Sequence, residues 1–199
     1  MEQNLEPKNN KKHLIIAVLL GLLLLVVGAG IYVYSTFDDI VSEVVLPTTQ
    51  DKDELKTAYD QLLAYEGVWE GEWTNNIFNN KGTVRVEVDV KEDGTIVALT
   101  DLNGKVFGWK DPQATAYTGT YTKDGAFFAI NTDSSYGTVN VFMRPDKTIV
   151  IHGAKIPLKR VELVTGAGTF DETKAHIDYS VDWIGSFGTN GTVDLKKVN

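Results

Sequence analysis

The chain contains no cysteine among its 199 residues. Disulfide bonds, cysteine nucleophiles and thiolate metal sites are therefore excluded. Its three histidines, His13, His152 and His176, are scattered and form no metal-ligand spacing. The sequence therefore predicts neither a metal nor a cofactor, and an exported domain of this composition would depend on its hydrophobic core alone.

Charged residues are also absent from the stretch Leu14–Tyr34. As an α-helix this stretch would be ~30 Å long, which is enough to cross the hydrocarbon core of a bilayer. Lys8, Lys11 and Lys12 precede it and predict a cytoplasmic N-terminus. We therefore expect a single-pass protein of the cell membrane, with a cytoplasmic tail at 1–13, a transmembrane helix at 14–34 and an extracellular C-terminal domain.

A cleaved signal peptide is the competing interpretation of this stretch. Val27-Gly28-Ala29 has the small residues of a cleavage site. The apolar run, however, continues through Tyr34 and is longer than the core of a signal peptide needs. This length favours an uncleaved anchor.

Residues 35–66 have the pattern of a helical stalk or linker. Apolar residues recur at helical spacing between Phe37 and Val45, and Pro47 ends that segment. A second helix is predicted over Asp51–Glu66, with Asp51 and Glu54 as a capping pair and Gly67 as a stop signal. Its apolar stripe should pack against the domain that follows; the stripe consists of Leu55, Tyr59, Leu62 and Leu63.

From Gly67 onward the hydrophobic pattern has a period of two, which is typical of antiparallel strands with one face in the core. Short turn signals separate the strands. The pattern predicts a mainly β domain over 67–199, an antiparallel up-and-down β-barrel or barrel-like meander. The expected strands are Val68–Trp73, Thr83–Val90, Thr95–Asp101, Ala116–Thr122, Ala126–Asn131, Thr138–Arg144, Thr148–His152, Leu158–Val164, Lys174–Trp183 and Gly191–Val198.

The segment Gly67-Val68-Trp69, which follows a helix and opens the first strand, resembles the Gly-x-Trp opening of the calycins. This superfamily includes the lipocalins and the fatty-acid-binding proteins. The resemblance implies that Trp69 closes one end of a barrel beneath a basic residue near the last strand, Lys196 or Lys197, and that the barrel holds a small apolar ligand. The chain departs from the lipocalins because it lacks their Thr-Asp-Tyr motif and their C-terminal helix.

Aromatic residues gather on the inward faces of two strands. Trp69 and Trp73 flank Gly71, and Tyr117 and Tyr121 repeat the arrangement. Aromatic faces beside small residues can line a pocket or fill a core. We predict Trp69, Trp73, Tyr117 and Tyr121 as ligand-binding residues.

The leading hypothesis is a membrane-anchored extracytoplasmic domain that binds a small apolar ligand or an envelope protein, and is not an enzyme. No catalytic residue is predicted, and the net charge of −8 disfavours nucleic acid as a partner. Two alternatives stay open: a structural or assembly subunit of a membrane complex, and a carboxylate-dependent enzyme acting on cell-envelope polymer. For the enzyme, Glu70 and Glu72 share one strand face.

Overall fold

The computed structural model describes residues 51–106, 109–123, 127–134, 137–154, 161–184 and 188–198. The described residues fall within one compact unit, Leu46–Asn199. The expected cytoplasmic tail, transmembrane helix and first stalk segment lie outside the described residues. Within the described ranges, no helix is both long and apolar enough to span a bilayer.

Helix α2 spans Lys52–Leu62 and begins where the sequence predicts. The Asp51 side chain accepts a hydrogen bond of 2.9 Å from the backbone N–H of Asp53, which satisfies one of the free donors of the first turn. The helix ends earlier than predicted, because the chain continues as the 3-10 turn η1, Leu63–Tyr65. It then enters the first strand through Gly67, whose φ of +119° favours glycine.

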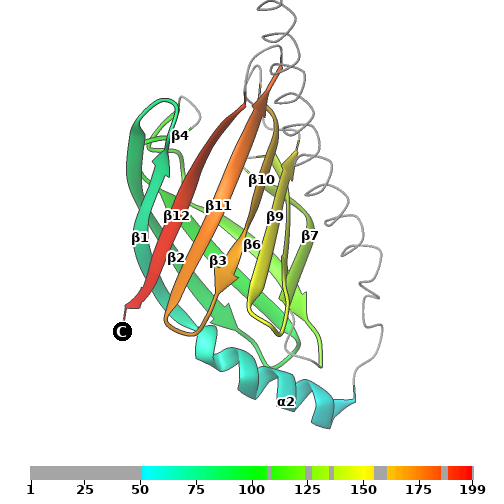
Figure 1. Cartoon of the computed structure of the whole chain (residues 1–199). Coiled ribbons are helices and arrows are strands. Elements are labelled where there is room, and N and C mark those ends of the chain that lie inside the picture. The colour runs from blue at the N-terminus through cyan, green and yellow to red at the C-terminus, as the bar shows by residue number, and fades with distance from the viewer. Residues whose placement is uncertain are drawn as a thin grey trace, which may run out of the picture. The chain divides into compact units, whose positions relative to one another are not determined.

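In the described part of the chain, ten antiparallel strands form one sheet, and β12 pairs with β1 to close this sheet into a barrel (Figure 1). The predicted antiparallel meander is therefore confirmed. Strand β6 pairs with β7 at Thr120–Phe128 and Tyr121–Phe127. The barrel strands are β1 Gly67–Asn75, β2 Asn80–Val90, β3 Thr95–Leu102, β6 Thr115–Tyr121, β7 Phe127–Ser134, β8 Gly137–Met143, β9 Thr148–Ala154, β10 Val161–Phe170, β11 Lys174–Trp183 and β12 Thr189–Val198.

The two faces of the strands separate core from solvent as the alternation predicts. In β2, Val84 and Val88 are buried, whereas Arg85 and Glu87 between them are exposed. Helix α2 lies across one end of the barrel (Figure 1). Its residue Leu62 joins the barrel core, so the predicted packing of the helix against the β domain is confirmed.

Two features of the sheet differ from the sequence-based expectation. Strand β10 extends to Phe170, well beyond the predicted end at Val164. A short hairpin of β4, Lys105–Val106, and β5, Trp109–Lys110, was not predicted at all. The extension contains Gly166 and Gly168, which carry no side chain to mark the alternation, and β4 and β5 are too short to show a period.

Candidate functional site

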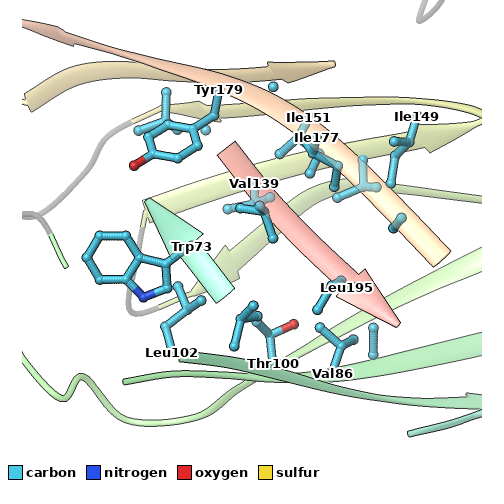
Figure 2. A pocket seen from close by; sticks show the side chains of 18 of the residues that line it. Trp73, Val86, Thr100, Leu102, Val139, Ile149, Ile151, Ile177, Tyr179 and Leu195 are labelled. Carbon is cyan, nitrogen blue, oxygen red and sulfur yellow. The ribbon is translucent and has the colours of Figure 1, made fainter. Parts of the chain in front are cut away.

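The barrel encloses a cavity of about 530 Å³. An eight-stranded barrel is just wide enough for its interior to be filled by side chains or to hold one small ligand, and the diameter grows with strand number. Ten strands therefore leave space. Figure 2 shows Ile149, Ile151 and Ile177 on one side of this space and Val86, Thr100 and Leu102 on the other.

The end of the barrel that α2 covers is filled by aromatic side chains. The Trp69 ring is fully buried and lies 4.6 Å from the Phe170 ring between centroids. Phe170 also contacts Tyr65 at 5.4 Å, and both Phe170 and Tyr65 line the cavity. These rings form its floor. Trp69 itself lies behind them and is not among the lining residues.

The surroundings of Trp69 match the arrangement that the calycin resemblance implies. Its indole N–H donates to the backbone carbonyl of Tyr65 at 2.9 Å. The Lys197 ammonium lies 5.8 Å from the centre of the Trp69 ring and donates to the carbonyl of Ala64 at 2.7 Å. A cation at this distance is attracted by the ring quadrupole. Lys197, rather than the exposed Lys196, is therefore the basic residue that lies over the Trp69 ring.

Trp73 lies four residues further along β1 than Trp69, on the same face and further from α2, and it lines the cavity. Its indole N–H donates to the carbonyl of Asn103 at 2.9 Å. The ring fits against Gly82 and Gly104: a Cβ at Gly82 would lie only 2.5 Å from the Trp73 nitrogen. The absence of side chains at these glycines fixes the position of the indole at the cavity wall.

Of the two predicted tyrosines, likewise, one lines the cavity and the other lies behind its closed end. Tyr117 lines the cavity. Tyr121 is buried near α2, where its hydroxyl donates to the carbonyl of Lys91 at 2.6 Å, and it is not a lining residue. The structure thus places Trp73 and Tyr117 at the cavity and Trp69 and Tyr121 at its closed end, and the ligand-binding roles of all four stay predictions.

The cavity is apolar and nearly uncharged. Lys105 is the single charged side chain among the described lining residues, and no Asp or Glu is present in that set. Burial raises the pKa of Tyr179, and burial raises the pKa of Tyr65 with a smaller contribution from the Glu172 charge. Both hydroxyls are therefore neutral near neutral pH.

The carboxylates that might have served an enzyme lie elsewhere. Glu70 and Glu72 are exposed on the outer wall of β1. Glu70 makes an ion pair with Arg85 at 2.5 Å. Within the described ranges, no group of three or more His, Cys, Asp or Glu side chains is placed to hold a metal ion.

Trp183 is a site residue that the sequence analysis did not select. It lines the cavity, and its indole N–H is buried without a hydrogen-bond partner among the described residues. Its neighbour across the cavity end is Phe78, whose ring meets the Trp183 ring edge-on at 6.1 Å. Alternation along β11 already places Trp183 on the inward face. Its contact with Phe78, more than a hundred residues earlier in the chain, cannot be predicted from a sequence pattern.

The comparisons with known proteins give a fold but no family. No protein family and no curated protein match the sequence. The crystal structure of Rv2717c from M. tuberculosis is similar, with a TM-score of 0.53 at 11% identity over 71% of this chain and 98% of that chain. The S-type phycobiliprotein lyase CPES from Guillardia theta has a TM-score of 0.40 at 10% identity, over 76% and 98%. The DFHBI-bound EF1p2_mFAP2b has a TM-score of 0.38 at 12% identity, over 71% and 99%. The likeness to Rv2717c shows a shared β-barrel fold.

Proposed function

We propose that the barrel binds a small, largely apolar ligand inside its cavity. The observation that carries this proposal is the volume of about 530 Å³ enclosed by apolar side chains. Ligand sites in proteins have volumes of ~300–1,000 Å³, mostly apolar linings and a few placed polar groups. A ligand in this cavity would gain ~25 cal/mol for each Å² of apolar surface that it removes from water.

The polar groups of the lining suggest how the ligand is oriented. The buried indole N–H of Trp183 has no partner within the described residues. Leaving such a donor unpaired costs ~1–3 kcal/mol, which a ligand acceptor could recover. An ether, carbonyl or hydroxyl oxygen at the end of the ligand near Trp183 would fit, and the apolar remainder would extend towards Phe170 at the floor.

The test is the binding of a neutral apolar dye, N-phenyl-1-naphthylamine, to the compact unit 46–199. Ala98 lines the cavity at the middle of β3. Ala98→Phe would place a ring in the space that the ligand needs. We expect this variant to bind the dye at least ~10-fold more weakly than the wild type, because the lost burial of apolar dye surface easily amounts to 1.4 kcal/mol.

Ala116→Phe is the matched control, because Ala116 is exposed on the outer face of the neighbouring strand β6. The same substitution there leaves the cavity unchanged, so dye binding should stay at the wild-type level. Equal dye affinity in both variants would refute binding in the cavity. Circular dichroism of both variants checks that the barrel has formed.

We further propose that Leu14–Tyr34 anchors this domain in a cell membrane, with the barrel on the extracytoplasmic side. The support is the uncharged run and the lysines before it. Protease added to intact cells should then remove the barrel and spare the tail. Protection of the barrel would contradict this topology, and a mature protein beginning near Gly30 would indicate a cleaved signal peptide instead.

A further inference from the structure

The two ends of the barrel differ in the chemistry of their turns. The turns that meet at the α2 end are rich in charge: Lys91-Glu92-Asp93-Gly94, Arg144-Pro145-Asp146-Lys147 and Asp171-Glu172-Thr173-Lys174. The opposite end is different. Two of its connections, β1–β2 at 76–79 and β11–β12 at 184–188, contain no charged residue. Two others are mainly basic: Lys105, Lys110 and Asp111 lie between β3 and β6, and Lys155, Lys159 and Arg160 lie between β9 and β10.

This opposite end also exposes large apolar side chains. Ile77 is 58% exposed, Phe78 57% and Ile184 63%. The contact between Phe78 and Trp183 brings the two connections together. Among the described residues only one other large apolar side chain is exposed, Leu99 at 42%, on the outer wall of β3. We call Ile77, Phe78 and Ile184 the apolar rim.

The cavity opens at the apolar rim. Its lining includes Phe78 and Lys105, which are both exposed, so the cavity reaches the surface at this end. Tyr65 and Phe170 close the other end beneath α2. An apolar ligand therefore has an entrance beside the apolar rim, where Lys105 is the charged side chain of the described lining.

We propose that the apolar rim docks on the surface of a phospholipid bilayer, so that an apolar ligand passes between the lipid and the cavity. This inference rests on the proposed ligand binding and adds the source of the ligand. Aromatic and aliphatic side chains at an interface enter the headgroup boundary readily, and basic side chains beside them can face the lipid headgroups. An ordinary protein surface would keep such side chains apart or covered.

The same chain supplies the reason to favour a bilayer over a protein partner. The uncharged run Leu14–Tyr34 is long enough to span a membrane, and residues 35–50 separate it from Asp51 at the start of α2. With the predicted helical segment Phe37–Val45 at 1.5 Å per residue and the other seven residues extended, that connection would reach ~37 Å. The ten residues of β11 extend over only ~33 Å. The length of the connection therefore permits either end of the barrel to reach the bilayer. The exposed apolar side chains of the rim favour docking by the end that carries them.

The experiment uses the full chain in phosphatidylcholine nanodiscs. Because the protein has no cysteine, Ile77→Cys and Ile184→Cys each give a single site for a fluorescent label. Lipids with a nitroxide near the headgroup then quench labels that lie at the interface. Leu99→Cys and Thr173→Cys are the controls: both positions are exposed, one on the outer wall and one in a charged turn near α2.

We expect quenching at residues 77 and 184 to exceed that at both controls by about threefold, because interfacial elements lie ~5–10 Å into the headgroup boundary. Equal quenching at all four positions would overturn the proposal. Labels at 77 and 184 that are shielded from a water-soluble quencher but not quenched by lipid would also overturn it, in favour of a protein partner. Lipid quenching does not require a ligand, so dye binding to the cavity tests the proposed function separately.

Discussion

The substitution Leu62→Ala tests whether α2 closes the barrel as part of the core. The Leu62 side chain is 1% exposed and packs among the residues of the barrel floor. Truncation of a buried leucine to alanine costs ~2–5 kcal/mol, from lost burial and the cavity left behind. We expect about 3 kcal/mol here, which in a domain of this size lowers the melting temperature by roughly 6–12 °C.

Leu63→Ala is a matched control one residue along the chain. Leu63 is only half-buried and lies outside the core cluster, so we expect its truncation to cost less than ~1 kcal/mol. Urea denaturation of residues 46–199, followed by tryptophan fluorescence, measures both free energies of unfolding. An equally small decrease in the free energy of unfolding in both variants would refute the packing of α2 against the barrel.

Three further predictions concern stability. Lys197→Met should cost about 1 kcal/mol, because it removes the cation over Trp69 and the hydrogen bond to Ala64; an unchanged urea midpoint would contradict this. Gly71→Ala should cost roughly 1–3 kcal/mol, since its Cβ would lie 1.7 Å from the Asp194 carbonyl oxygen; unchanged thermal unfolding would contradict this. The Asp194 side chain, with a 2.6 Å hydrogen bond, raises the pKa of His176. The stabilisation from this pair is fully present below the unfolded pKa of ~6.5 and is lost as the pH rises through the folded pKa. The melting temperature of wild type should therefore exceed that of His176→Gln by more at about pH 5.5 than at about pH 8.5. A melting-temperature difference that grows with pH would refute this prediction.

The β-barrel fold could be predicted because apolar and polar residues alternate along its strands with a period of two. Val84, Val88 and their exposed neighbours in β2 show that period clearly. The second half of β10 could not be found in this way, because glycine has no side chain to alternate. Gly168 is needed there for packing: a Cβ would lie 1.9 Å from the carbonyl oxygen of His176 on β11.

The candidate site could be predicted only in part, for a geometric reason. Alternation tells which face of a strand a residue occupies but not how far along the barrel axis it lies. Trp69 and Trp73 share the inward face of β1, yet α2 and Phe170 cover the first while the second lines the cavity. Tyr117 and Tyr121 differ in the same way on β6. The apolar rim depends on contacts between connections that are distant in the sequence, such as Phe78 with Trp183.

The central claim is that the interior of the barrel takes up an apolar ligand, and methyl NMR tests it most directly. The compact unit 46–199, labelled at isoleucine, valine and leucine methyls, is titrated with N-phenyl-1-naphthylamine. We predict saturable shift changes at the cavity methyls of Ile151, Ile177 and Val141, with none at the outer-wall methyls of Leu99. Shifts at Leu99 with unchanged cavity methyls, or no saturable shift anywhere, would contradict the account.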